Sequence, residues 1–209
     1  MTMDIEQWLT TENAGTRTLA YIAWYWWLAS WLDRRPNWPW AHVGVVFRNQ
    51  LCSALLVAAL GWPPPGDLDW TSGPALLWMA LWQSGWFYLL HRSLHQWAYA
   101  WHAQHHSMAP VRPLHAFYCS LTEHLLVNTL TTWTAWRSCP WRVTRPLVHV
   151  WYLTAVAASV TAHAELVNAE HLVHHCNPRV NFGPLRVWDW LGGTLSPAPK
   201  RKKSKKKLK

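Results

Sequence analysis

Residues 91–106 read HRSLHQWAYAWHAQHH, and residues 171–175 read HLVHH. These two stretches hold eight of the thirteen histidines in the 209-residue chain, in the patterns HxxxH, HxxHH and HxxHH. On an α-helix, residues three or four positions apart lie on the same face. Each pattern therefore directs two or more imidazoles to a common point, and together they predict helices that meet at one site.

Histidines clustered at this spacing indicate a transition-metal site. Imidazole binds Fe, Zn, Cu and Ni well, whereas Ca and Mg prefer oxygen ligands. Eight imidazoles exceed what one tetrahedral ion uses, so we expect two metal ions in a nitrogen-rich cage with an open position for substrate or oxygen. His163 is the best additional ligand, because it ends an apolar run where an imidazole needs a partner. The predicted metal ligands are His91, His95, His102, His105, His106, His163, His171, His174 and His175, of which all except His163 are also predicted to be catalytic.

The four remaining histidines give weaker signals. His42 and His149 are expected to lie in the core or at an interface. His115 and His124 stay open between a metal-ligand role and a core role.

Four carboxylates lie near the histidine patterns in the sequence. Glu123, Glu165 and Glu170 are candidates to accept a hydrogen bond from the outer ring nitrogen of a ligand, with solvated or structural roles as the alternative. Asp189 lies between two tryptophans. We expect it to cap a helix or to fix a loop and not to bind metal.

Five apolar runs predict membrane helices. Hydrophobic residues make up 51% of the chain and charged residues 14%, well below the roughly 25% charged share of a soluble domain. Many of the twenty tryptophans lie near the run ends, where their rings suit the membrane interface. The runs are Thr18–Leu32, Val43–Trp62, Ala75–Leu90, Leu125–Trp136 and Pro146–Thr161. The predicted fold class is an all-α integral membrane helical bundle with a cytosolic histidine-rich metal-binding cap, and a Trp-rich soluble helical core is the alternative.

The positive charge of the chain is concentrated in its C-terminal tail. The formal net charge is +9, but eight of the nineteen basic residues lie in residues 200–209. The other eleven nearly balance the ten acidic residues, which argues against a basic groove and against a nucleic-acid binder. Lys206 and Lys207 resemble a dilysine retrieval signal of endoplasmic reticulum membrane proteins, and a tail that only contacts anionic lipid is the alternative.

Loop charges suggest an orientation for the predicted spans. Arg34 and Arg35 are typical of a cytosolic loop, whereas Asp67 and Asp69 lie in a loop without basic residues. This assignment places the histidines and the C-terminus in the cytosol. Three arginines between residues 137 and 145 break the pattern. Either the hairpin of the last two apolar runs is shallow, or the orientation is reversed.

The motifs resemble those of one known family. The stretch HRSLHQWAYAWHAQHHSMAP, followed by EHLVHHCNPRVNFGPLRVWDWLGGT, closely resembles the fatty acid hydroxylase superfamily, also called the sterol desaturase family. The three histidine patterns match in order and type, and the segment 181–194 is most similar to the sterol C5-desaturase branch. The chain departs from the family where many members have a His-Pro pair before a glutamate, because Ser120 and Leu121 precede Glu123 here. His115 and His124 are the possible replacements for that ligand.

The resemblance implies a four-helix membrane core under a cytosolic cap that holds two Fe ions. It also implies O2-dependent hydroxylation or desaturation of a membrane lipid in lipid biosynthesis, with electrons from cytochrome b5 or a similar donor. A sterol is the favoured substrate, and a fatty acyl or sphingolipid substrate is the alternative. A non-catalytic membrane metal-binding protein is the rival from another class. The predicted organisation is N-terminal membrane helices in 1–74, a catalytic domain in 75–197 and a basic tail in 198–209, in a multi-pass protein of the endoplasmic reticulum membrane.

Overall fold

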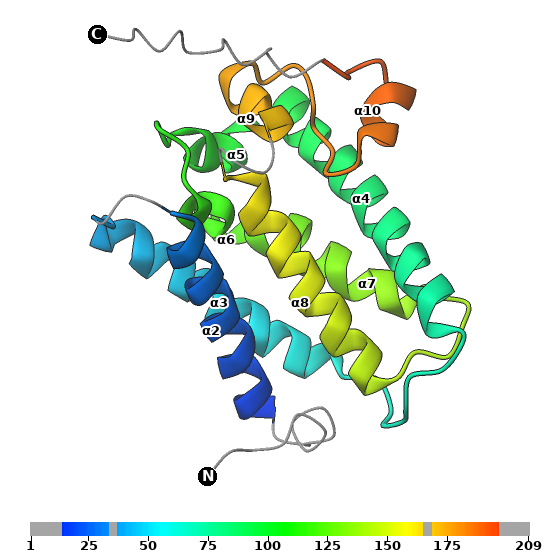
Figure 1. Ribbon diagram of the computed structural model, residues 1–209. Coiled ribbons are helices and arrows are strands. Elements are labelled where there is room, and N and C mark those ends of the chain that lie inside the picture. The colour runs from blue at the N-terminus through cyan, green and yellow to red at the C-terminus, as the bar shows by residue number, and fades with distance from the viewer. Residues whose placement is uncertain (1–13, 34–36, 165–168, 197–209) are drawn as a thin grey trace, which may run out of the picture.

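The computed structural model describes residues 14–33, 37–164 and 169–196, and these residues form helices and no strand. The predicted all-α fold is confirmed. The long helices run between two ends of the molecule, called the upper and lower ends as they lie in Figure 1. They are α2 (Ala14–Leu32), α3 (Trp40–Leu60), α4 (Ser72–Trp97) and α8 (Arg145–Ala162), together with the π-helix η2 (His124–Leu130), which continues directly into α7 (Thr131–Arg137).

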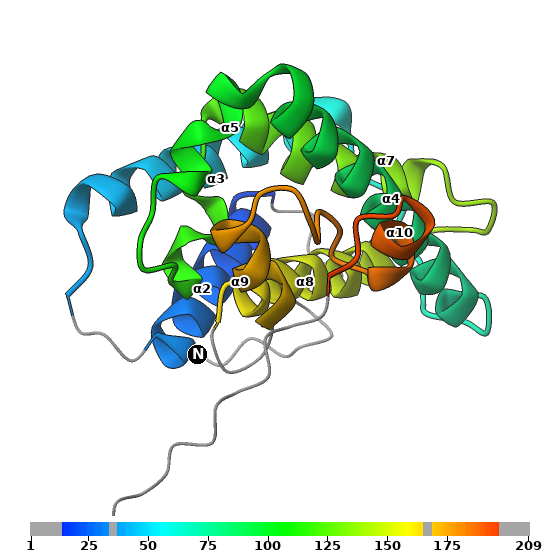
Figure 2. The same cartoon turned by 90° about the horizontal axis from the view of Figure 1, so that it is seen from above.

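Shorter helices build the upper end of the molecule. Seen from above, α5, α9 and α10 overlie the ends of the long helices (Figure 2). The short elements are α5 (Tyr99–His106), the 3-10 helix η1 (Pro113–Phe117), α6 (Leu121–Glu123), α9 (Ala169–Cys176) and α10 (Arg186–Leu191).

Prolines and glycines set the limits of the long helices. Pro39 has an extended backbone directly before α3, and Gly61 ends α3 with a φ of 92°, a left-handed conformation that a glycine adopts without strain. Pro146 lies in the first turn of α8, where its missing N–H leaves no helical hydrogen bond unmade. The helices therefore begin and end where the local chemistry favours it.

Two apolar clusters hold the long helices together. One joins α4, α7 and α8, and its largest members are Trp136, Leu147 and Trp151. The other joins α2, α3, η1 and α8 around Tyr25, whose hydroxyl donates to the carbonyl of Leu114 at 2.6 Å. Since α8 belongs to both clusters, it is the central helix of the bundle.

The hairpin of η2, α7 and α8 reaches the lower end of the molecule. At its tip, the backbone N–H of Arg145 donates to the carbonyl of Pro64, and the Thr144 hydroxyl donates to the carbonyl of Asp67. The tip therefore lies beside the loop that connects α3 to α4. Within the bundle the hairpin therefore extends as far as the neighbouring helices, and its depth in a membrane stays a prediction.

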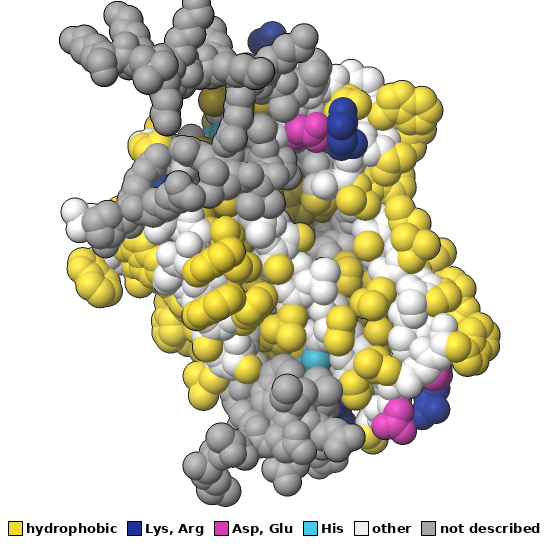
Figure 3. Space-filling model, in the orientation of Figure 1, with side chains coloured by type: hydrophobic (Ala, Val, Ile, Leu, Met, Phe, Trp, Pro, Cys, Tyr) yellow, Lys and Arg dark blue, Asp and Glu magenta, His cyan; other side chains and the backbone are white. Residues whose placement is uncertain are grey.

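The sides of the bundle are apolar. Phe47, Leu51 and Leu55 of α3 are 50%, 45% and 64% exposed, and Figure 3 shows apolar side chains across one face, with charged ones near its upper and lower ends. Among the helices in the described residues, α3 alone is long and apolar enough to qualify as a membrane span. A membrane core of several helices therefore stays a prediction.

Candidate metal centre

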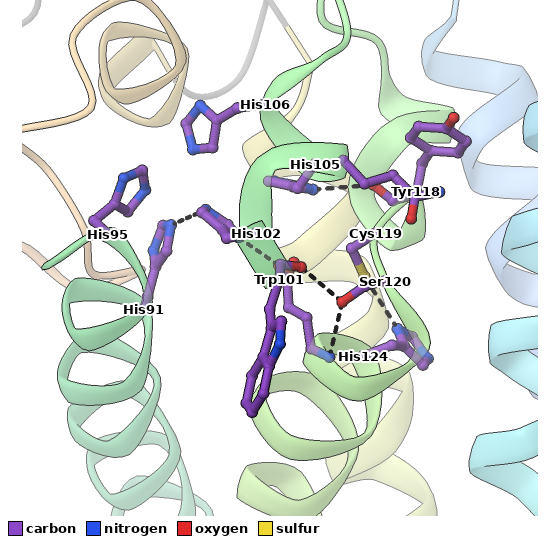
Figure 4. Close-up of polar contacts among 12 residues, drawn as sticks. His91, His95, Trp101, His102, His105, His106, Tyr118, Cys119, Ser120 and His124 are labelled. Carbon is purple, nitrogen blue, oxygen red and sulfur yellow. Dashed lines mark hydrogen bonds and ion pairs between the residues drawn. The ribbon is translucent and has the colours of Figure 1, made fainter. Parts of the chain in front are cut away.

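The first two histidine patterns face each other because α4 ends at a sharp break. Ala98 leaves the helical conformation with a φ of −140° and a ψ of 40°, and α5 starts at the next residue. The break turns α5 so that His102 lies beside His91, with 2.9 Å between their Nε2 atoms. Figure 4 shows these two side chains pointing toward each other from α4 and α5.

The third pattern and His163 come from the other side of the upper end. His163 lies directly after the last residue of α8, and α9 carries His171, His174 and His175. The Nε2 atoms of His163 and His171 are 3.2 Å apart. Each segment thus presents its histidines inward.

The nine histidines predicted as metal ligands form two groups. Within each group, one nitrogen of every ring lies within 4.8 Å of the corresponding nitrogens of the others. The five-histidine group consists of His91, His95, His102, His106 and His174. The four-histidine group consists of His105, His163, His171 and His175.

Hydrogen bonds on the outer ring nitrogens aim the inner ones at the centre of each group. The Nδ1 atoms of His105 and His163 donate to the backbone carbonyls of Tyr118 and Ser159, at 3.3 and 2.9 Å. Since a carbonyl only accepts, the proton of each neutral ring is on Nδ1 and the lone pair is on Nε2. The two Nε2 atoms are 3.3 Å apart, so two lone pairs face each other, an arrangement that a cation stabilises.

The five-histidine group has the same construction. His91 and His174 donate through Nδ1 to the carbonyls of Phe182 and Val180, at 2.7 and 2.8 Å. The Nε2 atom of His174 lies 3.1 Å from those of both His95 and His106, although it has a single lone pair. Two ligands at right angles on an ion with bonds of about 2.1 Å are about 3.0 Å apart. The spacing therefore fits metal ions in both groups.

Burial keeps these imidazoles neutral. It lowers the pKa of His106 to about 4, and burial together with the neighbouring His106 lowers the pKa of His174 to about 3. Burial also lowers the pKa values of His105 and His171 well below the ordinary value. Because a metal ligand must be unprotonated, the rings are ready to bind metal at neutral pH.

Glu123 is buried beside the five-histidine group. Its Oε1 atom accepts a hydrogen bond from Nδ1 of His102 at 2.8 Å, and burial raises the pKa of the carboxyl group well above its ordinary value. The Ser120 hydroxyl accepts from the backbone N–H of Glu123 and donates to the carbonyl of Trp101. Ser120 thus caps the start of α6.

The other candidates lie outside both histidine groups. The rings of His42 and His115 form an edge-to-face contact, and His149 is fully buried against Tyr21. His124 is buried, 3.9 Å from the Cys119 sulfur. None of the four belongs to either group.

Of the two other candidate glutamates, Glu170 and Glu165, only Glu170 lies in the described residues. Glu170 forms an ion pair with Arg186 at 3.3 Å. Glu165, and the predicted dilysine signal, lie outside the described residues.

Asp189 holds the loop that carries two of the accepting carbonyls. Its carboxylate accepts from the N–H groups of Phe182 and Gly183, each at 2.8 Å, and from the Thr194 hydroxyl at 2.7 Å. Since the Phe182 carbonyl in turn accepts from His91, Asp189 positions a metal-ligand candidate through the backbone. The expected loop-fixing role agrees with this geometry.

Replacing Asp189 with Asn is expected to weaken metal binding in the five-histidine group by about 10–100-fold. The Asn side chain has an NH2 group in place of one carboxylate oxygen. This NH2 group would face one of the three groups that now donate a hydrogen bond to Asp189. Metal titration of the purified protein measures the effect, with Asp67→Asn as the control because Asp67 is exposed at the lower end. Equal affinities in the two variants would contradict the assigned role.

The backbone carbonyls that orient the rings could not be identified from the sequence. Tyr118, Ser159, Val180 and Phe182 contribute through main-chain oxygen, which every residue has. The segment after the third histidine pattern was the one available signal, because it contains Phe182 and Asp189.

Comparison with known proteins assigns the family. No curated protein and no solved structure matches the chain significantly. The model of the fatty acid hydroxylase family matches residues 76–194, more than half of the chain and all nine clustered histidines. This family is membrane-associated and typically iron-dependent. The chain therefore belongs to the fatty acid hydroxylase/sterol desaturase superfamily.

Proposed function

We propose that this protein is an O2-dependent di-iron oxidoreductase that hydroxylates or desaturates a membrane lipid, with a sterol as the favoured substrate. The observation that carries the proposal is the inward convergence of nine neutral imidazoles in two groups. Each group would hold one iron. When bound, the irons supply the reduction of dioxygen and the removal of hydrogen from an unactivated C–H bond, which no side chain performs alone.

The protein's own residues hold and orient the imidazoles. His91, His105, His163 and His174 are each fixed by a backbone carbonyl. Glu123 fixes His102, and its carboxylate form is favoured by the positive charge that the group would hold. Rings that do not rotate keep the site preorganised.

A cavity of about 290 Å³, the upper cavity, lies directly below both histidine groups. Its roof includes His91 and His102 of one group and His105, His163 and His171 of the other. Its walls are formed largely by apolar side chains of α4, η2 and α8, such as Phe87, Val127 and Trp151. A C–H bond at the top of this cavity would lie against both groups, in largely apolar surroundings.

The upper cavity has a mouth on the side of the bundle. Four of its lining residues are exposed and uncharged: Thr154 and Ala158 of α8, and Pro184 and Leu185 of the loop before α10. Beside them, Trp190 and Leu191 of α10 are 68% and 63% exposed. Because an apolar rim of this kind suits a lipid, we infer that the substrate enters from the membrane.

Exposed tryptophans support a membrane position for the bundle. Trp40 and Trp97 lie toward the upper end and are 85% and 80% exposed, while Trp70 lies at the lower end and is 84% exposed. Such rings are typical of the two membrane interfaces. We propose that α2, α3, α4 and α8, together with the η2–α7 segment, form a multi-pass membrane core.

We propose the orientation of the bundle in the membrane from the basic C-terminal tail. Arginines are present at both ends of the bundle, so the charges of the loops alone do not determine which end faces the cytosol. The sequence that follows Ser196 is lysine-rich, and Ser196 is bonded to Asn181 at the upper end. The positive-inside rule then places the histidine groups and the C-terminus in the cytosol, with location in the endoplasmic reticulum and a cytochrome b5-type electron donor as parts of the same proposal.

Oxygen dependence tests the reaction type. The iron-loaded protein in lipid nanodiscs is expected to form an oxidised lipid only when both dioxygen and a one-electron donor are present. Mass spectrometry with isotopically labelled dioxygen separates an alcohol, which carries the label, from an alkene, which does not. Metal binding without any lipid product under these conditions would favour the non-catalytic rival.

The substrate class has a separate test. Expression in a host cell that lacks sterol C5-desaturation is expected to restore the missing sterol, as measured by lipid analysis. Unchanged sterols together with newly hydroxylated acyl chains would contradict the sterol preference and would support a fatty acyl or sphingolipid substrate.

A further inference from the structure

A second cavity of about 130 Å³, the lower cavity, lies inside the bundle among α2, α3, η2, α7 and α8. Its lining contains no Asp, Glu, Lys or Arg among the described residues. Polar side chains are nevertheless present in its walls, including Gln50, Ser53, His124 and Asn128. A polar lining in the middle of an apolar bundle needs an explanation.

A partition of four side chains separates the two cavities. Gln83, Asn128, Ala155 and Ser159 line both of them. Gln83 lies eight residues before His91 on α4, which is about 12 Å along the helix. A ligand that fills the upper cavity therefore meets the partition at its inner end, and only side chains stand between it and the lower cavity.

Among the residues that line the lower cavity, Gln50, His124 and Asn128 each have a hydrogen-bonding group without a partner among the described residues. Gln50 is 8% exposed, and its Oε1 atom accepts from the indole of Trp26 at 3.0 Å, which leaves its amide nitrogen unused. His124 is 2% exposed, and the Cys119 sulfur near Nδ1 leaves Nε2 unused. The Asn128 amide makes no hydrogen bond within the described part of the chain.

Unused polar groups in an apolar interior are costly unless a ligand or water satisfies them. The Gln50 amide nitrogen is a donor, so it requires an acceptor atom. Because no described residue in the lining of the lower cavity carries a charged side chain, a carboxylate, phosphate or ammonium group would have no ion-pair partner in the cavity wall. The chemistry therefore selects a neutral oxygen, as in a hydroxyl or a carbonyl group.

We propose that the lower cavity binds a hydroxyl or carbonyl group of the lipid whose oxidised carbon lies in the upper cavity. The proposal rests on the proposed function of the upper cavity and names the substrate more closely. The substrate is an amphiphile with a neutral oxygen group several carbon–carbon bonds from the oxidised carbon. On its way from one cavity to the other, the lipid passes Gln83, Asn128 and Ser159.

Equilibrium binding of hexadecan-1-ol and hexadecane tests the proposal. The two probes differ by one hydroxyl group, and binding is measured on the purified full chain in detergent without reductant, so that no turnover is needed. The wild-type protein is expected to bind the alcohol about fivefold to tenfold more tightly than the alkane, the effect of one hydrogen bond. Asn128→Leu and Gln50→Met are each expected to bring this ratio close to one.

Asn128→Leu tests the proposal more directly, because the Asn128 side chain makes no hydrogen bond to another described residue that the substitution would break. Gln96→Met is the matched control, since Gln96 is exposed on α4 and lines neither cavity. Unchanged metal content shows that each variant is folded. Equal binding of both probes to the wild-type protein, or an unchanged ratio in both cavity variants, would overturn the proposal and leave water as the occupant. Failure of the proposed function would give a different result: the protein would form no oxidised lipid but would still bind the alcohol more tightly than the alkane.

Discussion

His174→Ala is expected to remove most of the bound metal and to abolish lipid oxidation. The Nε2 atom of His174 lies 3.1 Å from those of two other histidines, so its loss opens the five-histidine group at its centre. Since removing a residue that only orients a ligand costs about 10–100-fold in affinity or activity, removing a ligand is expected to cost more. His105→Ala is expected to have the same effect through the four-histidine group. Metal analysis of the purified variants, together with product formation, measures both results.

His42→Ala is the control for these two variants. His42 lies outside both histidine groups and packs against the ring of Tyr118 in a tilted contact, so metal content and turnover are expected to be unchanged. Two metal ions per chain in His174→Ala would show that His174 is not a ligand.

Ala158→Trp is expected to lower lipid oxidation by about 100-fold or more while the metal content stays unchanged. Ala158 is exposed and lines the mouth of the upper cavity, so an indole ring there would occupy the entrance. A substrate that cannot reach the site, or that lies about 1 Å out of place, loses catalysis on this scale. Product formation in lipid nanodiscs, with metal analysis of the same sample, makes the measurement.

Val150→Trp is the matched control for the blocked mouth. Val150 is exposed on the same helix, two turns from Ala158, and lines neither cavity. Full activity in this variant excludes a general effect of an added tryptophan on α8. Full activity in Ala158→Trp would mean that the lipid reaches the upper cavity by another route.

The clustered histidines could be predicted as ligands from the sequence because most of them lie within short segments whose helical spacing places them on one face. Spacing on a helix places His102 and His106 on one face without knowledge of any other segment. His163 is predicted on a different ground, its position at the end of an apolar run eight residues before His171. The structure brings all nine predicted residues together.

Other features depend on contacts between distant segments, and spacing could not show them. The sequence did not indicate how the nine rings divide into two groups, because His105 and His106 are neighbours that belong to different groups. The tip of the hairpin is held beside the α3–α4 loop by the contact between Arg145 and Pro64, which are far apart in the chain. The two cavities depend on side chains from several helices, so no single segment encodes them.

The division of the rings means that α5 and α9 each serve both groups. His102 and His106 of α5 belong to the five-histidine group and His105 to the other, while His174 of α9 belongs to the first and His171 and His175 to the second. An ion in either group would therefore draw both helices into the position that the other ion requires. Under the proposed function, loading of the two ions is therefore expected to be cooperative, so that a partly supplied population would divide between empty chains and chains with both ions.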